Sequence, residues 1–488
     1  MENHQEQTKW SQFGSLIIVF FFWGFVAASN DILIPVFKKS FTLTQVQSQL
    51  VAWAFYAAYF VGSLIFFIIS LKSDVLQKFG YKKTLATGLV ISAIGALLFV
   101  PAAASASFWF FLTALFIVGL GFSVQQIVAN PLAIKMGSPQ TGAHRLTLAG
   151  AINSLGTTIG PIILGRILFG DGNSQTALDL TDVQIPFVVL AIAFILVAVF
   201  LLFSKIEDPA KSEEKKIDAG SERFNPFQYP QLILGMLAIF IYVGVEVSIA
   251  SNLPALLETA EFGNVQEHDI APFISLYWGS LMIGRWNGGV NVFNTSESVN
   301  KLLRFVVPFL AFAIIIGANT LMGKDVSAFY IYAIWIAGFI LMSFLGGKNA
   351  GKTLMIFGFA GMLMKLIGLF IPDKDLAKYF FISGGLFCSI MWPAIFDLAI
   401  AGLGKNTGKA SSFLIMMILG GGVIPIIQGW ICDFDKSSPA GIMGISWTHF
   451  SYIIPVICFI YLAFYGFITP KILRKQGISL EESDGQTH

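Results

Sequence analysis

Long apolar runs alternate with short polar segments along nearly the whole chain. A run of about 20 apolar residues is long enough to cross a bilayer as a helix. By this criterion the sequence predicts six spans before residue 205 and eight after residue 228. The predicted ranges are 15–37, 49–71, 84–104, 108–135, 145–168, 185–204, 231–253, 271–293, 305–322, 328–346, 352–371, 378–404, 409–431 and 446–469. The pattern therefore predicts an all-α membrane protein with 14 transmembrane helices.

A polar, charge-rich segment at 205–227 separates the two series of spans. It divides the chain into an N-terminal six-helix half at 1–204 and a C-terminal half at 228–488. A short repeat supports this division, since Ala28-Ser29-Asn30 and Ala250-Ser251-Asn252 each lie late in the opening helix of their half, shortly before a proline. Two packed halves around a site at mid-membrane are typical of transporters.

The distribution of Lys and Arg predicts the orientation in the membrane. With the N-terminus placed in the cytoplasm, the cytoplasmic segments hold 22 of these residues and the external segments hold seven. Lys and Arg are enriched in the cytoplasmic loops of membrane proteins. We therefore predict a multi-pass protein of the inner membrane whose two termini and linker are cytoplasmic.

Composition excludes several classes of protein. Charged residues make up 12% of the chain, about half of the roughly 25% typical of a soluble domain, and hydrophobic residues make up 56%. The net charge of +2 offers no grip on nucleic-acid phosphates. The histidines form no paired motif, no Walker lysine motif occurs, and the three cysteines fall in apolar runs. We expect no enzymatic activity, no nucleic-acid partner, no metal site and no cofactor other than a co-transported ion.

Asp31, Glu246, Asp397 and Lys365 fall inside predicted spans, where a charge costs about 2.5–3.5 kcal/mol on insertion scales. We interpret Asp31 and Glu246 as carboxylates that bind a proton or cation and release it. The alternatives are a water-capped Asp31 near the outer interface and a structural partner for Glu246 on a neighbouring helix. Asp397 and Lys365 lie nearer helix ends, where we expect snorkelling or a structural pair.

Amide side chains form a second constellation. Gln126 and Asn130 are four residues apart and share one helix face, and Asn153 lies on the next helix. Gln126 and Asn153 are equally far from the connecting loop, which predicts that both lie at one depth, roughly 13 Å from it at 1.5 Å per residue. Neutral amides donate and accept, so they suit the hydroxyl groups of an uncharged ligand. Interhelical hydrogen bonding is the alternative.

Further candidates complete the predicted site. We assign the amides of the short repeat, Asn30 and Asn252, to substrate binding, and Trp278 to stacking on the apolar face of a sugar ring. Gly420-Gly421-Gly422, followed by Pro425, permits either the local bending of a gate or simply close helix packing.

Several segments spread over nearly the whole chain together resemble the fucose:proton symporter family of the major facilitator superfamily, with its glucose/galactose and N-acetylglucosamine branches. The resemblance implies 12 helices, alternating access and cation-coupled sugar uptake. The segments are Phe22-Trp23-Gly24-Phe25, Asn30-Asp31-Ile32-Leu33-Ile34-Pro35, Ala129-Asn130-Pro131, Arg145-Leu146-Thr147-Leu148-Ala149, Asn153-Ser154-Leu155-Gly156, Gly284-Arg285-Trp286, and Ser411-Ser412-Phe413 through Gly422.

By this resemblance the family's first-helix aspartate falls on Asp31 and its fifth-helix asparagine on Asn153. The fucose branch has a glutamate where this chain has Gln126, which cannot titrate. Glu246 resembles a seventh-helix position of the glucose and amino-sugar branches and takes over that role in our interpretation.

The predicted fold is thus two six-helix bundles plus an extra two-helix hairpin at about 305–346, which we expect to be peripheral and lipid-facing. The predicted function is a monomeric symporter that imports a monosaccharide with H⁺ or Na⁺. A non-transporting membrane sugar sensor and a drug-efflux transporter are the alternatives.

Overall fold

The structure is a computed structural model that describes residues 9–72, 75–136, 142–169, 180–206, 225–290, 295–347, 349–403 and 407–478. Within these ranges a number of side chains in several helices, including those of 28–36, lie outside the described part. The described backbone is helical apart from turns and one isolated β-bridge between Ile442 and Ile445. An all-α fold is therefore confirmed for this part of the chain. Most of the predicted linker, 207–224, lies outside the described residues.

In the described part of the N-terminal half, the helices are α1 Trp10–Ser40, α2 Gln45–Ser48, α3 Leu50–Lys72, α4 Val75–Phe79, α5 Tyr81–Leu97, α6 Phe99–Ala104, α7 Phe108–Lys135, α8 Gly142–Phe169 and α9 Gln184–Phe203, with the 3-10 helix η2 Leu180–Val183. Helix α1 packs along α8, and α5 packs against α7 and α9. Gly24 permits the close contact of α1 with α8. Any larger residue would place its Cβ 2.0 Å from the carbonyl oxygen of Asn153, which is too close for two non-bonded atoms.

The C-terminal half begins with the 3-10 helix η3 Pro226–Gln228 and contains long helices and several broken ones. Its elements are α11 Pro230–Leu257, η4 Ala260–Phe262, α12 Glu267–Gly289, α13 Glu297–Leu321, η6 Ser327–Tyr332, α14 Ala333–Gly346, α15 Ala350–Phe370, α16 Lys374–Ile382, α17 Gly384–Cys388, α18 Met391–Ile400, α19 Thr407–Met416, η8 Met417–Leu419, α20 Gly420–Cys432, α21 Phe434–Ser437, α22 Trp447–Phe450 and α23 Ile453–Lys475.

Eleven described helices are long and apolar enough to cross a membrane. Helices α3, α8 and α12, with 23, 28 and 23 residues, are not among them. Helices α8 and α12 pack against each other, so their polar residues lie against protein rather than lipid. The predicted count of 14 is therefore not confirmed, since the described residues show eleven such helices.

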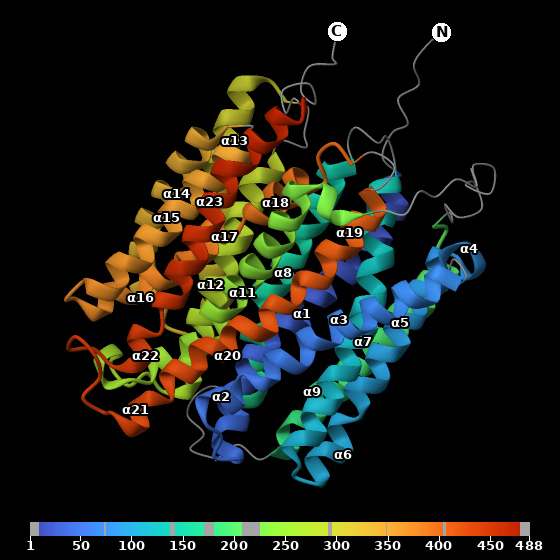
Figure 1. Cartoon of the computed structure of the whole chain (residues 1–488). Coiled ribbons are helices and arrows are strands. Elements are labelled where there is room, and N and C mark those ends of the chain that lie inside the picture. The colour runs from blue at the N-terminus through green and yellow to red at the C-terminus, as the bar shows by residue number, and fades with distance from the viewer. Residues whose placement is uncertain are drawn as a thin grey trace.

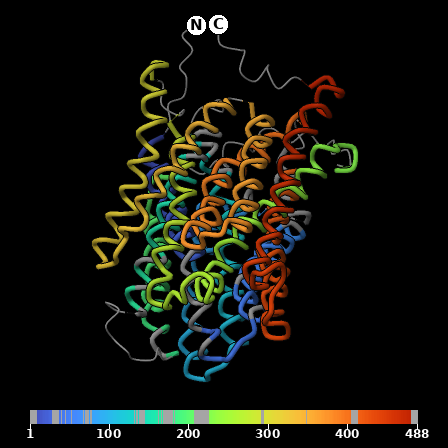
Figure 2. Tube along the Cα trace, turned by 90° about the vertical axis from the view of Figure 1, so that its left-hand side faces the viewer, coloured from blue at the N-terminus to red at the C-terminus, as the bar shows by residue number. Residues whose placement is uncertain are grey.

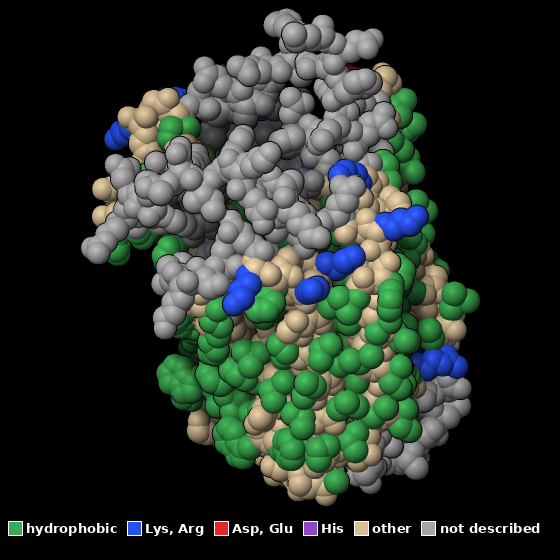
Figure 3. All heavy atoms as spheres, turned by 90° about the vertical axis from the view of Figure 1, so that its right-hand side faces the viewer, with side chains coloured by type: hydrophobic (Ala, Val, Ile, Leu, Met, Phe, Trp, Pro, Cys, Tyr) green, Lys and Arg blue, Asp and Glu red, His purple; other side chains and the backbone are tan. Residues whose placement is uncertain are grey.

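The two halves lie side by side as elongated bundles, with both termini at the same end (Figures 1 and 2). They meet where α8 packs on α12 and where α3 packs on α20. One broad face carries a belt of hydrophobic side chains, with Lys and Arg gathered mostly toward the end where the termini lie (Figure 3). Large apolar side chains on α9 are exposed, such as Phe203 at 86% and Ile185 at 71%. This surface suits a membrane environment.

The extra hairpin predicted at 305–346 consists of α13, η6 and α14. Helix α13 lies at the outer edge of the molecule (Figure 2), and only 28% of its membrane-length segment is buried. The expectation that the hairpin is peripheral is correct for its outer face, whereas its inner face makes polar contacts with α12 that hydropathy did not indicate.

Candidate functional site

Arg285 of the C-terminal half contacts residues of both halves. Arg285 on α12 lies with Nη2 3.5 Å from Oε1 of Glu246 on α11, an ion pair whose side chains are 19% and 13% exposed. Its other terminal nitrogen, Nη1, donates to Oδ1 of Asn153 at 3.4 Å and to Oγ of Ser154 at 2.9 Å, both on α8. The structure therefore brings together the predicted cation site Glu246 and the predicted sugar ligand Asn153.

Sequence reasoning missed Arg285 and Ser154 as site residues. Arg285 falls inside the predicted span 271–293, so the cost of a charge within a span was the signal that could have identified it. Ser154 gave no such signal, because serine is common in membrane helices and satisfies its hydroxyl on the backbone. Here it also donates to the carbonyl oxygen of Gly150.

Backbone contacts hold this cluster in place. Nδ2 of Asn153 donates to the carbonyl oxygen of Phe20 on α1 at 3.0 Å. The hydroxyl of Tyr277 on α12 donates to the carbonyl oxygen of Glu246 at 2.6 Å, and the indole of Trp286 donates to the carbonyl oxygen of Ala151 at 3.3 Å. Helices α1, α8, α11 and α12 thus position a carboxylate, a guanidinium and an amide at one place between the halves.

Gln126 on α7 has a different set of contacts. Its Nε2 donates to the hydroxyl of Tyr59 on α3 at 3.0 Å, and the ring of Tyr59 stacks on Tyr56 with centroids 6.2 Å apart. Asn130, four residues further along α7, is half-buried. The hydrogen bonds of Gln126 and Asn153 thus run to different helices, and a shared ligand for Gln126, Asn130 and Asn153 stays a prediction.

Asn252 and Trp278 are both buried on helices of the C-terminal half. Oδ1 of Asn252 accepts from Nε2 of Gln49 at 3.2 Å, and its Nδ2 donates to the carbonyl oxygen of Ser248. Asn252 thus takes part in a contact between the halves. The ring of Trp278 packs edge-to-face on Tyr277. The side chains of Asn30 and Asp31 lie outside the described residues, so their predicted roles stay predictions.

The glycine run lies where one membrane-spanning rod changes its helical geometry. The 3-10 helix η8 ends at Leu419, immediately before α20 begins at Gly420. A Cβ on Gly420 would lie 1.8 Å from the carbonyl oxygen of Phe240, and one on Gly422 would lie 3.1 Å from Cα of Trp53 on α3. The glycines therefore permit close packing within and between the halves. A mid-helix 3-10 turn is also a frequent hinge, and Pro425 follows within α20.

Polar contacts close the end of the bundle opposite the termini. Nζ of Lys38, in the last turn of α1, lies 3.6 Å from Oε2 of Glu258, and the amide of Val46 donates to Oδ2 of Asp433 at 2.8 Å. A cavity of about 600 Å³ adjoins the first pair and is lined by Lys38, Thr42, Leu43, Glu258, Asn264, Val265, Gln266 and Glu267. These contacts join the halves at this end of the structure.

Burial raises the pKa of the Glu258 carboxyl, and the neighbouring Lys38 ammonium partly opposes this shift. In a state where this end opens to water, Glu258 would return toward its ordinary pKa. The closed state therefore binds a proton at Glu258 more tightly than the open state does. Closure is fully favoured at a pH below the ordinary pKa, where Glu258 is protonated in both states, and it weakens as the pH rises through the raised pKa.

Lys38→Met is expected to open this end at neutral pH, because it leaves the Glu258 carboxylate without its cation. An exposed pair of this kind contributes up to about 1 kcal/mol, so the closed-to-open ratio should fall by up to about fivefold. Acidification should reverse the effect. Labelling of a cysteine in place of Ser48, which is fully buried on α2 in this closed state, by a membrane-impermeant maleimide would measure it, and Glu258→Gln, which removes the charge, should not increase labelling. Equal labelling of Lys38→Met and the parent protein would contradict the assignment.

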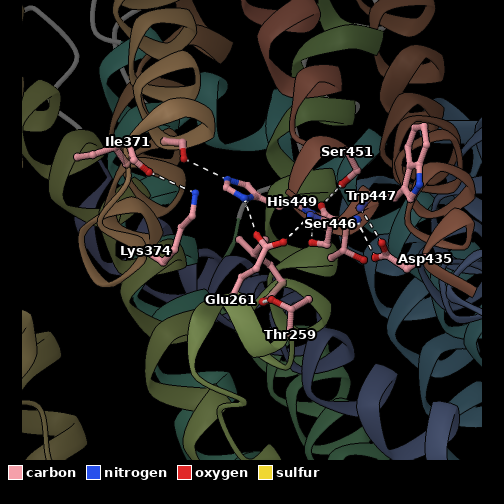
Figure 4. Close-up of polar contacts among 12 residues, drawn as sticks. Thr259, Glu261, Ile371, Lys374, Asp435, Ser446, Trp447, His449 and Ser451 are labelled. Carbon is pink, nitrogen blue, oxygen red and sulfur yellow. Dashed lines mark hydrogen bonds and ion pairs between the residues drawn. The ribbon is translucent and has the colours of Figure 1, made fainter. Parts of the chain in front are cut away.

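A second polar cluster at the same end lies within the C-terminal half (Figure 4). Glu261 accepts hydrogen bonds from the backbone amide of Ser446 and lies 2.9 Å from Nδ1 of His449. Asp435 accepts from the amides of Trp447 and Thr448 at 2.6 and 2.9 Å. His449, which the sequence places near a span end, is fully buried. The cluster fixes the short helix α22 and the loops around it.

Lys365 on α15 does not snorkel. Its side chain is fully buried, and Nζ donates to the carbonyl oxygens of Phe380 and Phe381 at 2.7 and 2.5 Å. These carbonyls belong to the last turn of α16, which has no helical partners for them. Lys365 therefore stabilises a break in this span, and the expectation of snorkelling is wrong. Within the described residues no group of three or more His, Cys, Asp or Glu could hold a metal ion.

Comparison with known proteins gives a consistent result. The sequence model of the Major Facilitator Superfamily matches residues 13–347. The glucose/galactose transporter of Brucella abortus is 31% identical over 473 residues, covering 96% of this chain and 97% of the relative. The L-fucose-proton symporter of Escherichia coli is 27% identical, covering 92% and 90%. The crystal structure of the transporter FucP in the outward conformation matches with a TM-score of 0.63 at 23% identity, covering 94% of this chain and 98% of that one.

Proposed function

The chain belongs to the major facilitator superfamily, a family of membrane transporters and not of enzymes, and we propose that it is a symporter that imports a monosaccharide with a cation. The contact of Arg285 with both Glu246 and Asn153 carries this proposal. A titratable carboxylate, a guanidinium and an amide meet there between the two halves. Any change in the charge of Glu246 would alter the interactions of Arg285, and through it those of the amide.

Asn153 is our leading sugar ligand. Its amide both donates and accepts, as a hydroxyl requires, and it lies on α8 where the halves meet. Gln126 and Asn130 would extend the site along α7, and Trp278 would offer an aromatic face. The named activities of the relatives, glucose/galactose transport and L-fucose–proton symport, support a hexose or deoxyhexose, with an N-acetylated amino sugar as a member of the same class.

Glu246 and Asp31 are our candidates for the coupled cation, which is H⁺ or Na⁺. Glu246 already has Arg285 beside it, and a fixed cation there disfavours binding of a second one. The guanidinium also opposes protonation of the carboxylate, but a proton needs no shell of oxygen ligands as Na⁺ does, so this site suits a proton better. The proton coupling named for the L-fucose relative supports the same choice. We therefore favour H⁺ for the Glu246 position.

We further propose 14 membrane spans in a monomer of the inner membrane. Helices α3, α8 and α12 are each long enough to cross at 1.5 Å per residue, and together with the eleven apolar helices they make 14. The excess of Lys and Arg at the end that carries the termini supports a cytoplasmic location of both termini and of the 205–227 linker (Figure 3). The end closed by Lys38 and Glu258 would then face outward.

Counterflow in proteoliposomes tests the function. Vesicles are loaded with an unlabelled hexose, deoxyhexose or N-acetylated amino sugar, and entry of the same labelled sugar is followed, with pH and Na⁺ gradients imposed separately. We expect exchange of at least one monosaccharide and uphill uptake driven by the pH gradient. Asn153→Ala should weaken sugar affinity by about tenfold or more, the scale of one lost hydrogen bond in a buried site.

Thr113→Val, which changes an exposed side chain of α7, is the matched control. Absence of exchange for every sugar in the panel would refute the proposed function. Exchange with unchanged affinity in Asn153→Ala would remove Asn153 from the site.

A further inference from the structure

Helix α12, which carries Arg285, is joined to the extra hairpin at four levels along its length. Nζ of Lys324 donates to the carbonyl oxygen of His268 at 2.8 Å, near the first turn of α12. Nδ2 of Asn319 lies 3.4 Å from Oγ of Ser275. Polar contacts between membrane helices average about 0.6 kcal/mol each, so a series of them is needed to fix one helix on another.

The two remaining levels involve η6 and α14. The hydroxyl of Tyr332 lies 2.8 Å from Oγ of Ser280. Oγ of Ser343 donates to Oδ1 of Asn287 at 3.1 Å, and Nδ2 of Asn287 donates to the carbonyl oxygen of Arg304 at 2.6 Å. The side chain of Asn287 is thus held on both its oxygen and its nitrogen by the hairpin.

Arg304 links the two helices of the hairpin beside Asn287. Its Nη2 donates to both the carbonyl oxygen and Oγ of Ser343 at 3.0 Å, and its guanidinium lies over the ring of Phe344, 4.5 Å from the centroid. The pair Arg304 and Ser343 therefore ties α13 to α14 at the level where both contact Asn287. We call Asn287, Arg304 and Ser343 the hairpin clamp.

Apolar contacts place the hairpin close to α12 and fix it to the rest of the half. A Cβ on Gly279 would lie 2.3 Å from Cδ1 of Ile315, so the backbone of α12 approaches α13 directly. On the other side, Trp335 packs on Phe380 with centroids 5.0 Å apart, and Phe339 packs on Phe357 at 5.6 Å. The hairpin is therefore held by α15 and α16 and can in turn hold α12.

The clamp lies beside the functional contact. Arg285 and Asn287 are two residues apart, about 160° around the helix, so they point to opposite sides of α12. Arg285 reaches Glu246 and Asn153, whereas Asn287 reaches Arg304 and Ser343. Both lie in the last turns before α12 ends at Gly289, where a helix frays most readily. Holding Asn287 therefore limits the positions that Arg285 can take.

From this arrangement we propose that the 305–346 hairpin is a positioning element of the transporter, which through the hairpin clamp holds the end of α12 so that Arg285 is shared between Glu246 and Asn153. The residues Asn287, Arg304 and Ser343 are positioning residues for coupling. The proposal rests on the proposed symport for its consequence, while the mechanical link between the clamp and Arg285 can be measured without any sugar.

Ser343→Ala is the principal test. It removes the hydroxyl that contacts both Arg304 and Asn287, and it changes the volume of the side chain only slightly. In proteoliposomes it should lower steady-state uphill sugar accumulation by about threefold or more, while exchange at equal concentrations stays within about twofold of the parent. Thr320→Val is the matched control, since Thr320 lies on the exposed side of α13 and donates only to its own helix. It should leave both readouts unchanged.

A double-mutant cycle in detergent provides the second readout. The melting temperature is measured for the parent, Ser343→Ala, Arg285→Lys and the double variant. If the clamp positions Arg285, the two shifts should fail to add by about 2 °C or more, as residues in one network do. Additive shifts, or a Ser343→Ala variant that accumulates sugar as the parent does, would overturn the proposal. If the parent transports no sugar, the proposed function fails and the melting cycle alone decides the link.

Discussion

Glu246→Gln is expected to abolish uphill sugar accumulation while exchange of sugar across the membrane continues. The amide keeps the shape of the side chain and an oxygen that can still accept from Arg285 at the 3.5 Å position. It cannot bind and release a proton, so the sugar would cross without the cation. With one proton per sugar, a pH difference of one unit supports about tenfold accumulation, and this ratio should fall to about one.

The measurement is the steady-state ratio of labelled sugar inside and outside proteoliposomes under an imposed pH gradient, followed by counterflow in the same vesicles. Glu297→Gln is the control, because Glu297 lies at the start of α13 with its side chain 83% exposed. It should behave as the parent does. A Glu246→Gln protein that still accumulates sugar about tenfold would show that coupling runs through another group, and Asp31 would be the next to test.

Arg285→Met is expected to cause the largest loss of stability and to stop transport. It leaves a carboxylate that is only 13% exposed without its cation, in contact with a protein interior. Removing one partner of a buried ion pair costs about 3–5 kcal/mol, and residual exposure places this site toward the lower end. The change also removes the donor that reaches Asn153 and Ser154, so the halves would lose a polar contact as well.

The double variant Glu246→Gln with Arg285→Met should recover most of that stability, because no unpaired charge remains, but it should not recover uphill transport. Thermal unfolding in detergent measures the stability of the variant, and uptake into proteoliposomes measures its uphill transport. Lys301→Met breaks an exposed pair with Glu297 at the start of α13 and should leave the unfolding temperature unchanged. A double variant as unstable as Arg285→Met would contradict the assigned charge pairing.

The class of protein and the positions of most helices follow from the sequence, because hydropathy is a property that each residue carries wherever it lies. The ranges predicted at 231–253 and 352–371 correspond to α11 and α15. Asn153 and Glu246 could be singled out for the same reason, since a polar group within an apolar run is costly unless something compensates it.

Only the tertiary structure decides which of these polar groups meet. Arg285 lies 132 residues from Asn153 and 39 from Glu246, and their contact depends on how α8, α11 and α12 are rotated about their axes. The sequence contains no direct record of that rotation. The rotation of each helix is fixed by close contacts between helices, such as that of Gly24 with the backbone of α8 and that of Gly279 with Ile315.

The same reason explains what sequence analysis could not predict. Lys365 is fully buried because a break in the neighbouring span offers it two carbonyls, and Asn287 contacts the hairpin because α12 turns that side away from Glu246. The sequence by itself therefore determined that this is a helical membrane protein with costly polar groups inside. The packing of its helices decided which of those groups face each other, because partners are fixed by distances in three dimensions and not by order along the chain.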